Sequence, residues 1–518
     1  MASQSRVALV RFVLALAVCL ALSVGAAHAA PSTSPSSQAK PRPDLAATVP
    51  PNPLPAPVTT EHTINLPGRT LHFKATAGAI RLSDAEDGKP IADIAYTAYQ
   101  LEGGDPHKRP LTVAVNGGPG ASSAWLDLGA IGPWRLPVDP QNISPSLPTQ
   151  VVDNADTWLD FTDLLFVDPL GTGYSRIVGK DEGAEKQFYS VNGDIDELST
   201  VVRKWLVAND RLASPKFIVG ESYGGFRAPK LARHLESKDG IGIDGIVMIS
   251  PVLDFAWFQS DSNPAIYAGH LPSLVAAAKG ITGLNPRDKL RAVESYASGP
   301  YLIDLYRGLR DDTAIRRMSL TIAGFTGMDA TFVQRLGGRV DSSTLMREKG
   351  RDAGTIASSY DATVKGYDPN PFDPTSHYDD PVLDALKVPL ATAMADLTAN
   401  TLGWPINARY EILNLAVTSR WDWHDGRHPA EAMGDLSTLL ALDKHFHALV
   451  MHGVEDQVTP YFTTKLLIDQ IPPYGDPSRL RLVVYDGGHM PYLEGDARAA
   501  MRDDARKLIE GEPAVGQR

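Results

Sequence analysis

The segment Phe217–Pro229 reads FIVGESYGGFRAP and contains the pattern Gly-x-Ser-x-Gly between an apolar run and a segment that favours a helix. Gly220 and Gly224 flank Ser222 at positions where a Cβ atom would obstruct a tight reversal from strand to helix. Such a turn exposes the serine hydroxyl on strained backbone, as in a nucleophile elbow. The pattern predicts Ser222 as a nucleophile, although a purely structural glycine-serine turn has the same short pattern.

Continuous apolar runs of the kind found in strands covered on both faces recur along the chain. They lie at residues 111–115, 164–167, 217–219, 245–249, 448–451 and 480–485. Shorter alternating runs between residues 61 and 99 predict antiparallel strands ahead of them. Residues 194–210 have one apolar face at helical spacing, with Asp194 as the expected N-cap. We expect an α/β fold with a mixed, mostly parallel sheet and antiparallel N-terminal strands.

The strand pattern stops between Asp254 and about Asp443, where helical segments alternate with Gly- and Pro-containing loops. We interpret this part, residues 255–442, as an inserted and mainly helical cap. The catalytic domain is then formed by residues 61–254 and 443–518. A cap at this place overhangs the carboxyl ends of the strands, where open α/β sheets bind ligands.

The N-terminal residues 1–30 carry two arginines, then an apolar run, then the small-residue ending AAHAA. This is typical of a secretory signal peptide, with cleavage expected near Ala29 or Ala30. The alternative is a membrane anchor, but the apolar run is short for one. We therefore expect an exported protein without stable membrane insertion after signal removal.

Residues 31–60 are rich in Pro, Ser and Ala and predict a disordered linker. Cys19 is the only cysteine and leaves with the signal, so the mature chain has no disulfides. A large exported chain of this kind is typical of a bacterial periplasmic or secreted protein. The net charge of -12, without a basic stripe, argues against a nucleic-acid partner.

A serine nucleophile needs a base and an acid that orients this base, and in α/β-hydrolases they follow in the order Ser, Asp or Glu, His. HALVMHGVEDQVTP at 447–460 places Asp456 after one apolar run, and LRLVVYDGGHMPY at 480–492 places His489 after the next. Parallel strands would bring both to the edge that carries Ser222. Glu455 is a rival for the acid, either residue is alternatively a simple loop residue, and His452 is interpreted as structural.

Acyl transfer also needs hydrogen-bond donors for the developing oxyanion. VAVNGGPGASS at 113–123 is a glycine-rich loop after a strand. The backbone N–H groups of Gly118 and Tyr223 are the natural pair of donors. A phosphate-binding loop is the alternative, but the lysine and hydroxyl that end such a loop are missing and Pro119 lacks an N–H.

The chain resembles the serine carboxypeptidase family in an ordered set of motifs. They are NGGPGASS at 116–123, NADTW at 154–158, DPLGTGYS at 168–175, GESYGG at 220–225, the aspartate of GVEDQVTP at 453–460 and GGHM at 487–490. The similarity runs from about Leu66 to the C-terminus and is weak through the cap. It is nearest to the bacterial, disulfide-free members, with WDW at 421–423 as a further point of likeness.

The resemblance implies that Asn116 and Glu221 bind the terminal carboxylate of a peptide. A buried, protonated Glu221 is able to donate a hydrogen bond to a carboxylate, whereas a structural carboxylate under the elbow is the alternative. Ala121 stands where the family usually has cysteine. Ala130 stands where it often has a second acidic residue, so we expect weaker carboxylate recognition and a pH optimum nearer neutral.

The sequence as a whole predicts an exported serine carboxypeptidase that forms an acyl-enzyme on Ser222 and acts on peptides with free C-termini. No metal or cofactor is expected, because the sequence has neither a His-Glu-x-x-His motif nor a cysteine cluster. Two other functions stay open: an esterase or acyltransferase with the same triad, and a non-catalytic protein that binds peptide ends. Side-chain preference and oligomeric state do not follow from the sequence.

Overall fold

The computed structural model describes residues 53–511, apart from residues 85–86, 179–181, 259–262, 374–379 and 426–427. The predicted signal peptide, Cys19 and residues 31–52 of the predicted linker lie outside the described residues. The first strand begins at Val58, and Leu54 before it is already buried. The first described strand and a buried residue thus lie before Glu61, inside the segment predicted to be a disordered linker.

One large sheet has the strand order β1-β2-β3-β7-β4-β9-β10-β15-β16, and the short β8 pairs with β3. The strands are β1 (Val58–Leu66), β2 (Arg69–Ser83), β3 (Pro90–Leu101), β4 (Leu111–Val115), β7 (Asp163–Val167), β8 (Arg176–Ile177), β9 (Lys216–Glu221), β10 (Gly245–Ile249), β15 (His447–Gly453) and β16 (Leu480–Tyr485). Pairings from β1 to β7 are antiparallel, and those from β7 to β16 are parallel. This confirms the predicted fold class.

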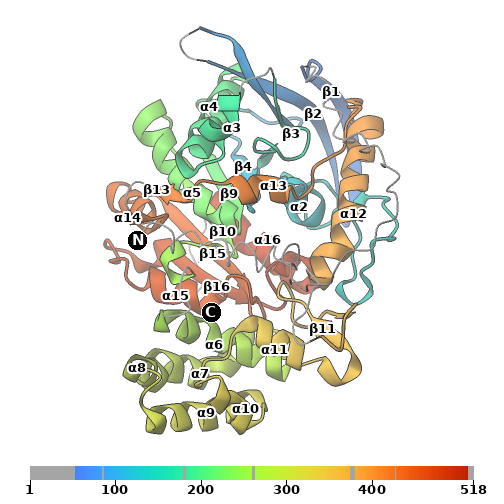
Figure 1. Cartoon of the computed structure of the whole chain (residues 1–518). Coiled ribbons are helices and arrows are strands. Elements are labelled where there is room, and N and C mark those ends of the chain that lie inside the picture. The colour runs from blue at the N-terminus through green and yellow to red at the C-terminus, as the bar shows by residue number, and fades with distance from the viewer. Residues whose placement is uncertain are drawn as a thin grey trace, which may run out of the picture.

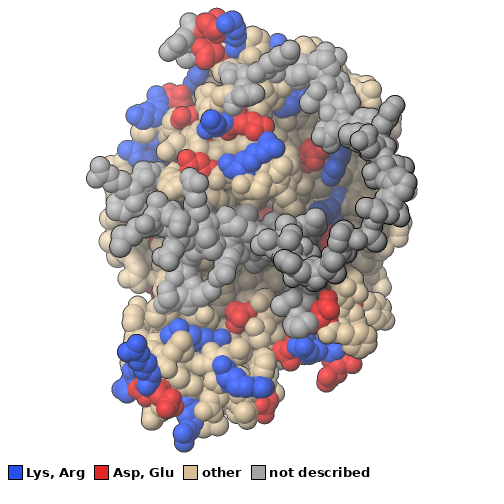
Figure 2. Space-filling view, viewed as in Figure 1, with Lys and Arg blue, Asp and Glu red and all other residues tan. Residues whose placement is uncertain are grey.

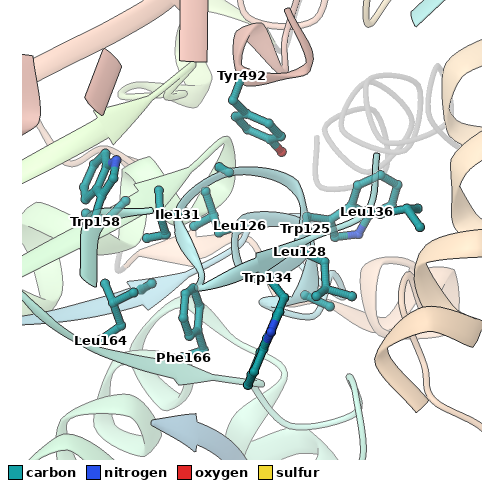
Figure 3. Packing of buried hydrophobic residues seen from close by; sticks show 14 of the residues in the cluster. Trp125, Leu126, Leu128, Ile131, Trp134, Leu136, Trp158, Leu164, Phe166 and Tyr492 are labelled. Carbon is teal, nitrogen blue, oxygen red and sulfur yellow. The ribbon is translucent and has the colours of Figure 1, made fainter. Parts of the chain in front are cut away.

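Two hydrophobic cores lie on opposite faces of the sheet because successive side chains of a strand alternate between its faces. In β9, Ile218 packs with α4 (Val191–Ala208) and α5 (Tyr223–His234). Its neighbour Val219 packs in the other core, with α12 (Pro381–Asp396) and α16 (Gly495–Glu510). Figure 3 shows part of this second core, which includes Trp125, Leu126 and Trp134 as well as Phe166 of the sheet. Helix layers therefore hold the central strands from both sides.

The expected N-cap of α4 is wrong by one turn. Ser190 caps this helix, and its hydroxyl accepts from the backbone N–H of Gly193. Asp194 lies inside the first turn, is 1% exposed and pairs with Arg227 of α5. Both residue types favour an N-cap, and the burial of Asp194 against a cation is what the sequence pattern did not reveal.

The region between β10 and β15 contains a helical lobe (Figure 1), and the core of this lobe also includes Tyr461 and Phe462 of α15 (Tyr461–Ile468). Its helices are α6 (Pro264–Lys279), α7 (Arg291–Tyr296), α8 (Leu302–Arg307), α9 (Asp312–Thr326), α10 (Ala330–Arg335) and α11 (Ser342–Glu348). The later part behaves differently: α12 joins one core of the main sheet, and α14 (Met433–Leu442) packs on α5. The described part of residues 255–442 is therefore divided between this helical lobe and the helix layers that pack on the main sheet.

The surface in Figure 2 has basic and acidic residues interspersed among the described residues. Within the part of the chain that the structure describes, no helix combines the length and the apolar character that crossing a membrane requires.

Candidate active site

Ser222 lies at the turn between β9 and α5 with φ 59° and ψ -120°, a conformation that non-glycine residues rarely adopt. Its backbone is held by two hydrogen bonds of 2.9 Å, from its own N–H to the oxygen of Ile249 and from Gly225 N–H to its oxygen. A Cβ atom at Gly220 would collide with the Gly224 carbonyl, and one at Gly224 with the Val115 carbonyl. The structure therefore contains the strained turn that the glycine pattern predicts.

His489 and Asp456 meet in a fully buried cluster after β16 and β15. Nδ1 of His489 is 3.0 Å from Oδ2 of Asp456. The backbone N–H groups of Val458 and Thr459 donate to Oδ1 of Asp456 at 2.8 and 2.9 Å, and the Thr459 hydroxyl donates to Oδ2 at 2.8 Å. The carboxylate is thus fixed by donors on both oxygens and orients the imidazole through Nδ1.

The structure separates the two candidate acids. Both carboxyl oxygens of Glu455 are buried without a hydrogen-bond partner among the described residues. Burial raises the pKa of Glu455 to about 8. Of these two acids, Asp456 is the one that contacts His489. His452 is also buried, with its Nδ1 3.8 Å from Oδ2 of Asp456 and its Nε2 3.0 Å from the Thr464 hydroxyl.

The charged groups of this cluster shift one another's pKa values. Burial alone would raise the pKa of Asp456, but the charge and hydrogen bond of His489 and the nearby imidazole of His452 hold this pKa well below its usual range. For His489 burial acts to lower the pKa, and the charge and hydrogen bond of Asp456 outweigh it, so this pKa is raised. Asp456 therefore stabilises the imidazolium form that a general base reaches during catalysis.

The glycine-rich loop after β4 packs directly against the elbow. A Cβ atom at Gly117 would be 2.5 Å from the backbone nitrogen of Tyr223. Gly118 has φ 100°, which favours glycine, and Gly118 and Tyr223 line the same cavity as Ser222. The two predicted oxyanion donors are thus brought to one place by tertiary contact.

Arg227 supports this loop, although the sequence analysis did not identify it. The guanidinium group donates to the carbonyl oxygens of Asn116 and Gly117. It also forms a two-point ion pair with Asp194 at 2.7 and 2.9 Å, and both residues are about 1% exposed. An arginine in the otherwise apolar first turns after the elbow was the available sequence signal.

Asn116 and Glu221 are neighbours at the base of the cavity. The Asn116 side chain acts on the Glu221 carboxyl group and lowers its pKa, and the Oδ1 atom of Asn116 accepts from the N–H of Leu126 at 3.0 Å. Oε2 of Glu221 accepts from the hydroxyl of Tyr492 at 2.6 Å. Burial raises the pKa of Glu221 to about 7, although His489, Tyr492 and Asn116 oppose the shift. The group is therefore able to be a neutral donor in acidic to neutral solution.

One cavity collects most of the predicted site residues. Asn116, Gly118, Glu221, Ser222, Tyr223 and His489 line it, while Asp456 lies behind His489. The remaining walls are mainly apolar and aromatic: Trp125, Val252, Phe255, Tyr360, Leu383, Leu413, Trp423, Val458 and Met490. Several of these come from residues 255–442, so this region contributes walls of the cavity.

The WDW segment supports the elbow from the side. The rings of Trp421 and Trp423 contact the ring of Tyr223 edge-on, with centroid distances of 5.6 and 5.8 Å. Among the described residues there is no cluster of three or more His, Cys, Asp or Glu that is arranged to hold a metal ion.

The chain is similar to proteins of known name over part of its length. Serine carboxypeptidase-like 14 of Arabidopsis thaliana is 27% identical over 40% of this chain and 46% of its own length. The pheromone-processing carboxypeptidase kex1 of Schizosaccharomyces pombe is 31% identical over 38% of this chain and 34% of its own. The matches thus span less than half of these relatives. Proline iminopeptidase of Mycobacterium smegmatis aligns with a TM-score of 0.37 at 15% identity, over 84% of this chain and 100% of that one.

The family match covers the elbow and the oxyanion loop together. Residues 67–270 match the model of the serine carboxypeptidase family, and this range includes Asn116, Gly118, Glu221, Ser222 and Tyr223. Asp456 and His489 lie outside it, and their place in the site rests on the geometry above. Through residues 67–270, the chain is therefore similar to the serine carboxypeptidase family.

Proposed function

We propose that this protein is an exported serine carboxypeptidase that removes C-terminal residues from peptides through an acyl-enzyme on Ser222. The observation that carries the proposal is the single cavity lined by a serine on an elbow, a histidine backed by Asp456, two backbone donors and a Glu221–Asn116 pair. The first three parts suit acyl transfer in general. The last part is what favours a substrate with a free carboxylate.

The proposed reaction uses His489 twice. With Nδ1 held by Asp456, Nε2 takes the proton of Ser222 while Oγ attacks the scissile carbonyl carbon. The N–H groups of Gly118 and Tyr223 stabilise the oxyanion. Collapse of the tetrahedral intermediate breaks the C–N bond, and His489 passes its proton to the departing amine. Water activated by the same histidine then hydrolyses the acyl-enzyme.

The terminal carboxylate of the substrate is bound by Asn116 and by protonated Glu221. A neutral carboxyl group donates a hydrogen bond to the substrate, whereas an ionised one repels it. The apolar walls further favour peptides whose last two residues are hydrophobic, since beside Glu221 and His489 no charged side chain of the described residues lines the cavity.

A peptide library with free C-termini, followed by mass spectrometry, tests this function. We expect stepwise shortening from the C-terminus, fastest for apolar residues and slowest for acidic ones. Faster release of an acidic residue would contradict the substrate preference. Cleavage of simple esters without shortening of any peptide would instead support an esterase.

A fluorophosphonate probe separates a catalytic from a non-catalytic protein. Wild type is expected to be labelled on Ser222, and Ser222→Ala is expected to be unlabelled. Absence of labelling in folded wild-type protein would favour a protein that only binds peptide ends.

Export is proposed from the sequence of residues 1–30. Expression of the full chain in a bacterial host, followed by N-terminal sequencing of the periplasmic and secreted protein, is expected to give Ala30 or Pro31 as the first residue. A cell-associated product that begins at Met1 would contradict it.

A further inference from the structure

Tyr492 approaches Glu221 from outside the cavity. Its hydroxyl donates to Oε2 of Glu221 at 2.6 Å, and its ring is 1% exposed. It lies in the 3₁₀ turn Pro491–Leu493, three residues after His489. Glu221 lines the cavity and Tyr492 does not. The loop after β16 therefore brings the histidine to the cavity and a phenol to the back of the glutamate.

The position of this phenol is fixed by packing of its ring and by a hydrogen bond to its backbone. A Cβ atom at Gly129 would be only 2.9 Å from the tyrosine ring, so the ring lies directly on that glycine. The backbone of Tyr492 is also held, because Arg498 donates to its carbonyl oxygen at 2.9 Å and pairs with Asp156 at 2.8 Å. Tyr492 belongs to the same core as Leu126 and Ile131 (Figure 3). A ring held in this way leaves its hydroxyl little freedom to leave Glu221.

We infer that Tyr492 is a positioning residue: it keeps Oε2 of Glu221 as an acceptor, so that Oε1 carries the proton and donates it to the terminal carboxylate of the substrate. A neutral carboxyl group has one O–H donor and one carbonyl acceptor. If Oε2 were free to carry the proton, Oε1 would present lone pairs to the substrate carboxylate. The inference rests on the proposed carboxypeptidase function.

Among the described residues, Tyr492 is the one hydroxyl side chain with a recorded hydrogen bond to the carboxyl group of Glu221. Ala130 has only a methyl group, and Asp127 one turn earlier accepts from the hydroxyl of Tyr99 at 3.1 Å. The ionisable groups that act on Glu221 are His489 and Asp456 from the loops after β16 and β15, Tyr492, and Tyr360 from the segment before β12 (Lys365–Tyr367). His489 favours the ionised form of Glu221, as does the amide of Asn116, and Asp456 opposes it.

Tyr492→Phe tests the role because it removes only the hydroxyl. The hydrogen bond from Tyr492 stabilises the ionised carboxylate, so its removal raises the pKa of Glu221. The pH at which KM begins to rise is therefore expected to move upward by about one unit. At pH 5 the proton then occupies either oxygen, which leaves half the molecules competent and increases KM about twofold. We expect kcat to change by less than about twofold, since the triad is untouched.

Two controls distinguish positioning from a general structural effect. Tyr485→Phe removes a comparable bond, from the tyrosine hydroxyl to Asp504 Oδ2 at 2.8 Å, away from Glu221. It is expected to leave the KM profile unchanged. In a Glu221→Gln background KM has no such pH step, and adding Tyr492→Phe is expected to create none.

A measurement without turnover makes the result independent of the proposed activity. Infrared spectra recorded as a function of pH show a carboxyl band for Glu221, which is identified because Glu221→Gln lacks it. The intensity of this band reports the protonation of Glu221. Its midpoint is expected to be higher in Tyr492→Phe than in wild type. An unchanged or lower infrared midpoint overturns the role of Tyr492, whether or not peptides are cleaved. A raised midpoint in a protein that cleaves no peptide supports Tyr492 and counts against the proposed function alone.

Discussion

His489 and Asp456 are joined by a 3.0 Å contact from Nδ1 to Oδ2, while the adjacent Glu455 has buried oxygens without a described partner. Two neighbouring acids of one loop thus have different environments. We expect Asp456→Asn to lower kcat by about 10⁴-fold, because an amide at this place favours the wrong histidine tautomer. Glu455→Gln is the matched control. It is expected to retain kcat within about threefold, since a glutamate with a raised pKa is already neutral near pH 7.

Steady-state kinetics on a blocked peptide with a free C-terminus measures both variants. A larger loss for Glu455→Gln than for Asp456→Asn would assign the acid role to Glu455.

Ser222→Ala is expected to lower kcat by at least about 10⁴-fold, with little change in peptide binding, because only a hydroxyl is removed. His489→Ala should be about as severe, since nucleophile and base act together. Ser250→Ala is a suitable control: Ser250 also has positive φ, at 45°, but does not line the cavity. Near-normal hydrolysis by Ser222→Ala or His489→Ala would remove the basis for the triad.

Amidation of a good peptide's C-terminus is expected to lower kcat/KM by roughly tenfold or more, the effect of losing one charge-assisted hydrogen bond. The comparison uses one peptide sequence as free acid and as amide. Equal cleavage of the two forms would show that Asn116 and Glu221 do not recognise the carboxylate and would favour an esterase.

The pH dependence of kcat and of KM is expected to separate. Neutral His489 is the base, so kcat rises with pH through its raised pKa and is lost in acid. Protonated Glu221 is the donor, so KM rises as pH passes its pKa of about 7. The optimum of kcat/KM is therefore near neutral. In Glu221→Gln, which keeps a donor but does not ionise, KM should be nearly constant from pH 5 to pH 8. If its KM profile matches that of wild type, Glu221 is structural.

Arg227→Met is expected to lower the free energy of unfolding by about 3–5 kcal/mol, because it leaves Asp194 charged and buried without its partner. It should also reduce kcat, since Arg227 holds the carbonyl groups of the oxyanion loop. Urea denaturation and kinetics measure the two effects. Arg420→Met removes the exposed pair with Glu185, at 2.8 Å, and is expected to cost less than about 1 kcal/mol. Equal stability of the two variants would contradict the supporting role of Arg227.

Local patterns in the sequence determined the elements of the fold and pointed to the residues that the structure brings together in the candidate site. The glycines around Ser222 are needed by the turn itself, because a Cβ atom would meet backbone within a few residues or on the adjacent strand. The apolar runs specify buried parallel strands, and the chain order of Ser222, Asp456 and His489 matches the loops at one sheet edge.

Only the tertiary structure decided which neighbours these groups have. The choice of Asp456 over Glu455, the pairing of Asp194 with Arg227 instead of a helix cap, and the bond from Tyr492 to Glu221 join residues that local periodicity does not relate. Tyr492 and Glu221 are 271 residues apart in sequence. Contacts over such distances are set by which faces of the sheet, helices and loops pack together, and this depends on the whole core rather than on any one segment.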